Sequence, residues 1–336
     1  MVGRYSRQTI YQPIGEKGQE KIKSSMVVVI GCGALGTVIA SALARAGVGH
    51  LRIIDRDFIE YHNLQRQALF DEKDIREGLP KALAAEKHLK EVNSEIRVEG
   101  IIADVNYTNI ERFIQGAQVI LDGLDNTETR FLINDASLKS GIPWIYGGAI
   151  GSTGMTMTIV PGITPCFRCI AGGPAAAGTT LTCDTGGVIS PAPWTVASLQ
   201  VAEALKILVG APNLNPDLLF LDVWENTFRS FKLSRRGDCP ACQGKYEFLD
   251  GQAGVKATSL CGQNAVQVLN TGKNRVSFQA LEERLRSVGT VRYNEFMFNF
   301  DDGSHEMVVF PDGRAIVKNT ADESLARGLY AKYIGA

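Results

Sequence analysis

The stretch that most constrains the fold is VVVIGCGALG, residues 27–36. Four apolar residues run directly into a G-x-G-x-x-G loop, whose glycines are Gly31, Gly33 and Gly36. A strand without apolar–polar alternation is typical of a parallel sheet buried on both faces, and a glycine loop opening a helix is typical of a phosphate site. Asp55 ends the next apolar run and suits a ribose hydroxyl. The pattern indicates an adenine nucleotide but does not decide between NAD, FAD, ATP and S-adenosylmethionine.

The first 150 residues alternate apolar runs with helical patterns, which predicts an α/β fold with a doubly wound, mostly parallel, Rossmann-like sheet. We expect strands at residues 26–31, 50–55, 96–104, 117–125, 143–151 and 154–162. We expect helices at residues 35–46, 81–92, 129–140 and 194–209. Ligands of such sheets bind at the carboxyl ends of the strands.

Two later segments differ in character. Residues 171–193 are dominated by Gly, Ala, Thr and Pro and contain Cys183, and a loop of this length is typically functional or disordered. Residues 249–336 contain short strand patterns separated by Asp-Gly turns and a final helix. We therefore predict two domains, a larger nucleotide-binding domain over residues 1–248 and a small α+β domain over residues 249–336.

Composition limits the possible partners. The formal charge of the 336-residue chain is -1, so no overall field favours nucleic acid or an anionic membrane. No apolar run has the length of a membrane span, and the N-terminal residues do not form a signal-peptide pattern. These observations predict a cytoplasmic protein without a nucleic-acid or membrane partner.

Four of the seven cysteines form two C-x-x-C pairs, Cys166 with Cys169 and Cys239 with Cys242. An odd cysteine count in a chain of this length does not indicate a disulfide scaffold. The two pairs predict one tetrahedral structural Zn²⁺ site, since four thiolates leave no open position for catalysis. A redox role for the pairs is the alternative.

A polar cluster follows the second predicted strand. The segment DRDFIEYHNLQRQ places Asp57, Asn63, Arg66 and Gln67 on the ligand side of the sheet, and Lys81 begins a helix behind a proline. Guanidinium and ammonium groups pair with phosphate oxygens and stabilise the charge of a displaced pyrophosphate. Each residue alone could be a solvated surface group. Together they favour an enzyme that handles a triphosphate over an NAD-dependent enzyme.

A second cluster ends a later strand. The motif LDGLDN supplies Asp122, Asp125 and Asn126, whose hard oxygen atoms suit Mg²⁺. Helix capping is the alternative for these side chains.

These motifs together resemble the ThiF/MoeB-type adenylyltransferases, which are relatives of the ubiquitin-activating enzymes. The resemblance rests on RYSRQ, GCGALG, AGVGHLRIIDRDFIEYHNLQRQ, LPKA, DGLDN, PCFRC, CDTGG and CPAC, and it covers about seven-tenths of the chain. The remaining residues resemble, less specifically, the tail of longer bacterial proteins of this kind. Cys32 stands where such proteins often have glycine, and we interpret it as a packing residue.

The resemblance implies roles for individual residues. The nucleotide loop would comprise Gly31, Gly33 and Gly36, Asp55 would hold the ribose, and the phosphate ligands would be Asn63, Arg66 and Lys81. Asp125 would hold Mg²⁺. Arg7 resembles an arginine that reaches the nucleotide from the partner subunit, which implies a homodimer. Asp57, Gln67 and Asn126 complete the predicted nucleotide site.

The implied activity is the ATP- and Mg²⁺-dependent adenylation of the C-terminal glycine of a ubiquitin-like sulfur carrier that ends in Gly-Gly, in thiamine, molybdopterin or a related biosynthesis. A cysteine desulfurase or sulfurtransferase would then supply sulfur. Cys183 would form a thioester or persulfide, and the alternative is that it is a bystander without a chemical role. The alternatives are adenylation of another carboxylate such as a peptide terminus, an NAD-dependent oxidoreductase, and a zinc-stabilised scaffold that binds its partner without turnover.

Overall fold

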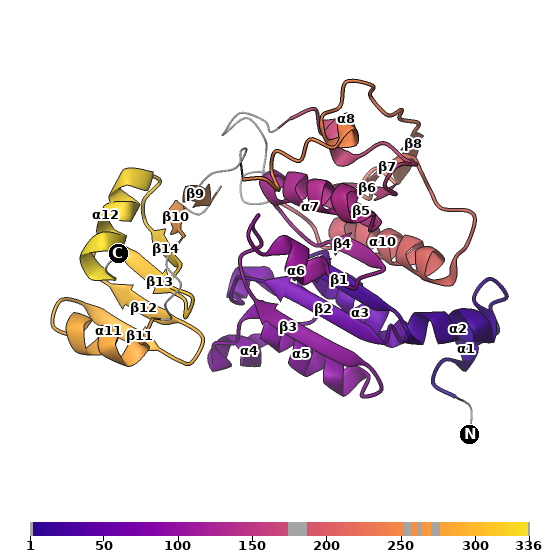
Figure 1. Ribbon diagram of the computed structural model, residues 1–336. Coiled ribbons are helices and arrows are strands. Elements are labelled where there is room, and N and C mark those ends of the chain that lie inside the picture. Colours follow the sequence, from indigo (N-terminus) through magenta and orange to yellow (C-terminus); the bar gives the residue numbers. More distant parts are fainter. Residues whose placement is uncertain (1–2, 174–186, 252–256, 261–263, 270–275, 335–336) are drawn as a thin grey trace. The chain divides into compact units, whose positions relative to one another are not determined.

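The computed structural model describes residues 3–173, 187–251, 257–260, 264–269 and 276–334 (Figure 1). The chain divides into two compact units, one extending to Ala253 and one that begins at Gly254. The second unit begins a few residues after the predicted start of the second domain at Leu249, because Phe248 and Leu249 pack in a core of the first unit. Cys183 lies outside the described residues.

The first unit is built on an eight-stranded sheet in the order β3-β2-β1-β4-β5-β6-β7-β8. Its strands are β1 Met26–Ile30, β2 His50–Asp55, β3 Arg97–Ile102, β4 Val119–Asp122, β5 Trp144–Ile150, β6 Thr153–Ile159, β7 Leu218–Asp222 and β8 Thr227–Phe231. The strands from β3 to β5 pair in parallel, and those from β6 to β8 are antiparallel. The predicted doubly wound, mostly parallel sheet is confirmed.

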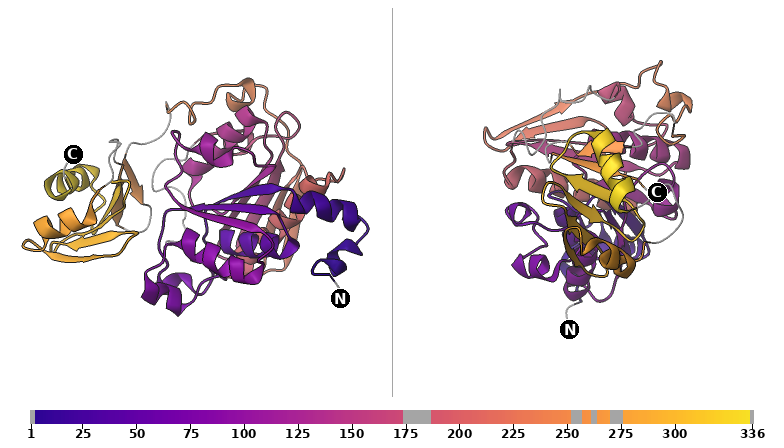
Figure 2. Two further views of the ribbon diagram at one scale, coloured as in Figure 1. Left: turned by 60° about the horizontal axis from the view of Figure 1, so that its bottom comes forward. Right: turned by 90° about the vertical axis from the view of Figure 1, so that its left-hand side faces the viewer.

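Helices cover both faces of this sheet (Figures 1 and 2). They are α1 Ser6–Thr9, α2 Gly15–Lys23, α3 Gly36–Ala46, α4 Glu72–Glu77, α5 Lys81–Val92, α6 Ile110–Ile114, α7 Thr127–Ser140, α8 Phe167–Ala171 and α10 Pro191–Val209, with 3₁₀ turns η1 Tyr61–Asn63 and η2 Ala241–Gln243. Helices α3, α5 and α10 share one core with the sheet, and α6 and α7 share the other. Among the described helices, none is both long enough and apolar enough to cross a membrane.

Strand β1 is buried on both faces, which accounts for its unbroken run of apolar residues. Val27 and Val29 belong to the core on the α3 side, whereas Val28 and Ile30 belong to the core on the α7 side. All four are fully buried, so neither face of the strand can carry a polar side chain at low cost.

The second unit is a small antiparallel sheet with two helices. Its strands have the order β11-β12-β13-β14-β10-β9, with bounds β9 Ala257–Leu260, β10 Ala265–Val268, β11 Thr290–Tyr293, β12 Phe298–Asp301, β13 Glu306–Val309 and β14 Ala315–Lys318. Helices α11 Phe278–Leu285 and α12 Glu323–Tyr333 contribute Leu281, Leu285 and Tyr330 to its core.

The order of the large sheet reverses between β1 and β4, since the chain winds outward from β1 in one direction and from β4 in the other. In open α/β sheets ligands bind outside the carboxyl ends of the strands at such a switch point. The loops after β1 and β4 are therefore the expected location of the site.

Candidate active site

The glycine loop after β1 lies directly against the loop after β4. A Cβ on Gly31, whose φ is +90°, would lie 2.6 Å from the carbonyl of Gly123, and a Cβ on Gly36 would lie 2.0 Å from the Gly31 oxygen. Both positions therefore require glycine for packing alone. Gly33 differs, because the nearest atoms to its Cβ would be 3.8 Å away. Its missing side chain leaves room above the loop, as close approach of a phosphate requires.

Asp55, at the end of β2, fixes the shape of the glycine loop. Its carboxylate accepts the main-chain N–H groups of Cys32 and Asp57, the latter at 2.7 Å. Burial raises the pKa of Asp55, and the nearby Lys81 ammonium opposes that shift. Each carboxylate oxygen retains a further lone pair, so the predicted ribose contact stays chemically possible. Cys32 is fully buried beside Asp55, in agreement with a packing role.

Lys81 is the first residue of α5, and its ammonium is the central buried cation of the site. Pro80 precedes it, and its Nζ lies 3.2 Å from Oδ2 of Asp57. Burial alone would lower the pKa of Lys81, but the carboxylates of Asp57, Asp55 and Asp125 outweigh burial and raise it. The lysine is therefore charged: it forms an ion pair with Asp57, and the charges of Asp55 and Asp125 also favour its ammonium form.

The segment after β2 holds the remaining predicted phosphate ligands. Asn63 is buried and accepts the N–H of Glu60 in a capping box around η1, and Nη1 of Arg66 donates to the carbonyl of His62 at 2.7 Å. Trp194, on α10, donates its indole N–H to the Arg66 carbonyl at 2.8 Å. Local contacts thus fix the backbone here and leave other guanidinium N–H groups of Arg66 for a ligand.

Gln67 has an unsatisfied acceptor beside the glycine loop. The residue is 3% exposed, and its Oε1 accepts no hydrogen bond from the described residues. Its Nε2 would lie 3.8 Å from a Cβ on Gly33. Buried polar atoms are rarely left without a partner, so this oxygen fits a donor group on a ligand.

The loop after β4 corrects one expectation. Asp122 is fully buried, and its carboxylate accepts Nε of Arg130 at 2.9 Å and the N–H of Leu124 at 2.9 Å. These contacts use it inside the protein, so the prediction that Asp122 offers its oxygens to Mg²⁺ is wrong. Asn126 caps α7 by accepting the N–H of Thr129 at 3.0 Å. Asp125 is exposed and is the remaining carboxylate of the motif that can face a ligand.

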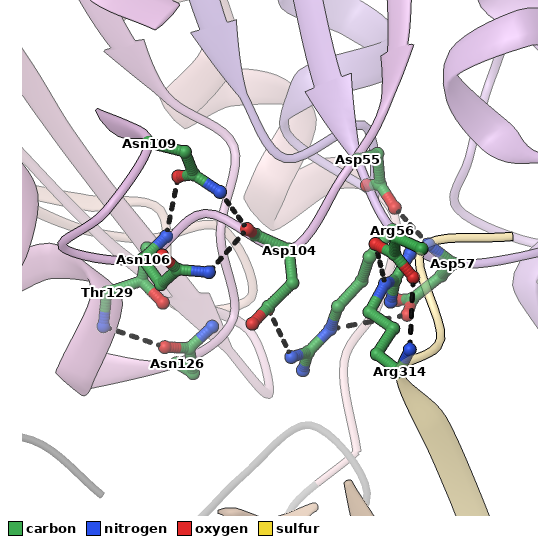
Figure 3. A network of polar contacts seen from close by, with 10 residues as sticks. Asp55, Arg56, Asp57, Asp104, Asn106, Asn109, Asn126, Thr129 and Arg314 are labelled. Carbon is green, nitrogen blue, oxygen red and sulfur yellow. Dashed lines mark hydrogen bonds and ion pairs between the residues drawn. The ribbon is translucent and has the colours of Figure 1, made fainter. Parts of the chain in front are cut away.

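Three residues that the sequence did not single out belong to this edge of the sheet. Figure 3 shows Arg56 directed at Asp104, in the loop after β3, with Nη1 to Oδ1 at 2.8 Å. The third of these residues is Arg130, which pairs with Asp122. The Asp125 carboxylate contributes to raising the pKa of three cations: Lys81, Arg56 and Arg130. Arg130 follows the helix cap by one turn, which is a usable sequence signal, whereas nothing local distinguishes Asp104.

The four predicted zinc ligands meet on the α7 side of the sheet. The Sγ atom of Cys166 lies 3.7 Å from Sγ of Cys169 and 3.6 Å from Sγ of Cys239. The Sγ atom of Cys169 lies 3.6 Å from Sγ of Cys242. A Zn–S bond of about 2.3 Å requires S···S distances of roughly 3.8 Å in a tetrahedron, so the cluster fits Zn²⁺. Among the described residues these four are the group of His, Cys, Asp and Glu side chains that could hold a metal.

Helix α7 supports both arms of the cysteine cluster. Oδ1 of Asn134 accepts the N–H of Phe167, next to Cys166, and Asp135 accepts the N–H of Phe248 at 3.0 Å. Phe131 stacks on Phe248 with ring centroids 4.9 Å apart. The helix that follows Asp125 and Asn126 is thus also packed against the segments that carry the cysteine cluster.

Arg7 lies on the exposed surface of α1, at the opposite end of α3 from the glycine loop. The neighbouring Gln8 donates to the carbonyl of Ala46, the last residue of α3, at 2.9 Å. The 11 residues of α3 separate this point from Gly36 by about 16 Å. Arg7 is therefore not placed beside the glycine loop of its own chain.

This arrangement is an α/β fold with a glycine loop, a buried lysine and an exposed aspartate at the switch point of its sheet. Residues 5–241 match the ThiF family, and the chain belongs to that family. It is an adenylyltransferase, in agreement with the resemblance seen in the motifs.

Individual relatives support this assignment. The chain is 43% identical to "Sulfur carrier protein ThiS adenylyltransferase" of Bacillus subtilis over 339 residues, which is 100% of both chains. It is 38% identical to "SAMP-activating enzyme E1" of Haloferax volcanii, over 71% of this chain and 88% of that one. The crystal structure of E. coli MccB with ATP superposes with a TM-score of 0.63 and 27% identity, covering 72% of this chain and 75% of MccB.

Substitutions at two glycines of the loop, Gly36 and Gly33, should have different effects. Gly36→Ala should lower the free energy of unfolding by about 3 kcal/mol, because its Cβ would collide with the Gly31 carbonyl. Gly33→Ala should unfold like the wild type but bind ATP more weakly, because its methyl group would occupy the space left for phosphate. Thermal unfolding and calorimetric titration with ATP measure the two effects. A Gly33→Ala protein with normal ATP affinity would exclude the loop from the nucleotide site.

The cysteine cluster predicts about one zinc ion per chain by elemental analysis. Cys239→Ser should lose the metal and unfold at a lower temperature, because the two arms packed on α7 lose their link. Cys32→Ala is the matched control: it removes a buried thiol from the same unit and should keep the zinc. A metal-free wild-type protein of unchanged stability would contradict the assignment.

Proposed function

We propose that the chain adenylates the C-terminal glycine carboxylate of a ubiquitin-like sulfur carrier that ends in Gly-Gly, using ATP and Mg²⁺. The observation that carries the proposal is the exposed Asp125 carboxylate after β4, at the same switch point as the buried Lys81 ammonium, whose pKa it helps to raise. The names of the relatives, a ThiS adenylyltransferase and a SAMP-activating enzyme, support a carrier protein as the acceptor. Because the first of these matches over the whole chain, a ThiS-like carrier of thiamine biosynthesis is the preferred candidate over a molybdopterin carrier.

The reaction joins two anions, so charge is its main physical problem. A carboxylate oxygen of the carrier attacks the α-phosphorus of ATP in line, the bond from that phosphorus to the β-bridging oxygen breaks, and pyrophosphate leaves with the bonding electrons. The products are an acyl adenylate and pyrophosphate. The protein contributes position and positive charge rather than covalent chemistry.

The site residues divide these tasks. The loop of Gly31, Gly33 and Gly36 would receive the phosphates, Asp55 the ribose, and Gln67 a nucleotide donor group. Arg66 and Lys81 would neutralise phosphate charge, with Asn63, Asp57 and Asn126 holding the surrounding segments. Three carboxylates around Lys81 disfavour a bare triphosphate. Bound Mg²⁺ would supply the missing charge, and Asp125 is the residue that would hold it.

We also propose that the active form is a homodimer in which Arg7 completes the site of the other subunit. Arg7 lies at the far end of α3 from its own glycine loop, as described above. An arginine that contributes to the reaction must therefore come from a second copy.

Sulfur transfer would follow adenylation. The Cys183 thiolate would attack the acyl carbon of the adenylate, so that a C–S bond forms, the acyl C–O bond breaks, and AMP leaves a thioester behind. Alternatively, the outer sulfur of a persulfide delivered by a cysteine desulfurase or sulfurtransferase would attack the same carbon and release AMP, which gives an acyl disulfide. The chain after residue 186 supports this proposal, because Gly187 accepts the N–H of Gly151 at 2.8 Å and Val188 accepts Nε2 of Gln65 at 3.4 Å. Those contacts hold Val188, five residues after Cys183 in the sequence, next to Gln65, the neighbour of Arg66.

Pyrophosphate exchange tests the proposal. The wild-type enzyme should move label from pyrophosphate into ATP only with a Gly-Gly carrier present. Asp125→Ala should reduce this exchange by about a hundredfold to a thousandfold with the fold intact. Near-normal exchange by the folded variant would remove Asp125 from the site.

Cys183→Ala is the comparison variant for that assay. Adenylation forms a phosphorus–oxygen bond and needs no thiol, so this variant should retain exchange and lose any covalent carrier adduct in intact mass. A peptide terminus that supports exchange where Gly-Gly carriers do not would replace the carrier by another carboxylate substrate.

The dimer proposal predicts subunit complementation. Arg7→Ala and Asp125→Ala should each be inactive, but a co-expressed mixture should recover roughly a quarter of wild-type exchange, because half of the symmetric dimers pair the two variants and hold one intact site. Arg7→Ala mixed with itself is the control. Activity of the mixture no higher than that of either variant would contradict a shared site.

A further inference from the structure

The most buried ion pair near the proposed site joins Asp122, at the end of β4, to Arg130, in the second turn of α7. Nε of Arg130 lies 2.9 Å from Oδ2 of Asp122, and the two side chains are 10% and 0% exposed. Removing two charges from water costs several kcal/mol, so a pair at this depth is poor evidence for a purely stabilising role.

The remaining contacts of the pair converge on Leu124. Oδ1 of Asp122 accepts the N–H of Leu124 at 2.9 Å, and Nη2 of Arg130 donates to the Leu124 carbonyl at 2.6 Å. The same Nη2 donates to the carbonyl of Gly147, in β5, at 2.8 Å. Both main-chain polar groups of the residue before Asp125 are therefore held by the pair, which is itself held by the neighbouring strand.

The rest of the loop is fixed as well. The N–H of Gly123 donates to the carbonyl of Ile30 at 2.8 Å, and Asn126 caps α7. Asp125 is thus an exposed side chain on a backbone that is fixed immediately before and after it.

We propose that Asp122 and Arg130 form a positioning unit that sets the main-chain location of Asp125 so that its carboxylate meets the divalent cation on ATP. This inference rests on the proposed function. In this unit Arg130 acts through its hydrogen bond to the Leu124 carbonyl, so it is a positioning residue.

Two variants separate positioning from stability. Arg130→Lys retains the charge opposite Asp122, but a single ammonium cannot also reach the carbonyls of both Leu124 and Gly147. The double variant Asp122→Asn with Arg130→Met removes both charges, so no uncompensated carboxylate stays buried if the single variants fold poorly.

The measurement is the affinity for ATP by calorimetry, once with Mg²⁺ and once with EDTA. With Mg²⁺, both variants should bind ATP about tenfold more weakly than the wild type, which is the size of effect seen for other groups that orient a metal ligand. With EDTA, both variants should bind ATP as tightly as the wild type. Hydrogen exchange at the Leu124 amide should also accelerate. Arg52→Lys is the matched control: Arg52 is equally an arginine paired with a carboxylate, Glu99, and a carbonyl, Phe113, at 3.0 and 2.7 Å. It should leave the Mg²⁺-dependent affinity unchanged.

Three outcomes overturn the inference. Folded variants with the wild-type gain in affinity from Mg²⁺ would do so, as would variants that lose affinity equally with Mg²⁺ and with EDTA, because the pair would then support the whole pocket. The third outcome is that the wild type shows no carrier-dependent pyrophosphate exchange, measured in parallel; this would overturn the proposed function and the inference together. If the wild type does show this exchange but the variants bind ATP as the wild type does, only the inference is overturned.

Discussion

The contact between the loops after β1 and β4 is the constraint on which the site depends. Gly31 and Gly123 approach so closely that a Cβ on Gly123 would lie 2.2 Å from the Gly31 oxygen. This approach brings the amino ends of α3 and α7 together at one edge of the sheet. Main-chain N–H groups from one helix and the Asp125 carboxylate next to the other can therefore act on the same triphosphate.

The site combines buried cationic side chains with nearby carboxylates. Lys81, Arg56 and Arg130 are buried or half-buried, and each has its pKa raised in part by Asp125. The carboxylates nearby keep these cations ionised but also reduce the attraction for an anionic nucleotide. In the function we propose, a divalent cation would resolve this conflict, because it would bind the exposed Asp125 carboxylate and the phosphates at the same time. Preorganised charge of this kind does not have to rearrange during the reaction.

Helix α7 links two parts of the first unit that serve different purposes. Its first turns hold the Asp125 loop through Arg130, and its middle turns hold both arms of the cysteine cluster through Asn134 and Asp135. The cluster has no open position for chemistry, so its contribution is mechanical. Zinc would therefore fix the middle turns of α7.

The sequence by itself determined the features that depend on neighbouring residues. The β1–glycine loop–α3 unit, the place of Lys81 at the start of α5 behind Pro80, and the two C-x-x-C pairs all follow from local spacing. Only the tertiary structure decided that Asp122 pairs with Arg130 instead of facing a metal, that Arg56 meets Asp104, and that Arg7 lies away from its own glycine loop. The carboxylates of Asp122 and Asp125 are equivalent as sequence. Burial and the position of one helix turn make the first a support and leave the second exposed, because an unpaired charge is stable only where water or a ligand can reach it.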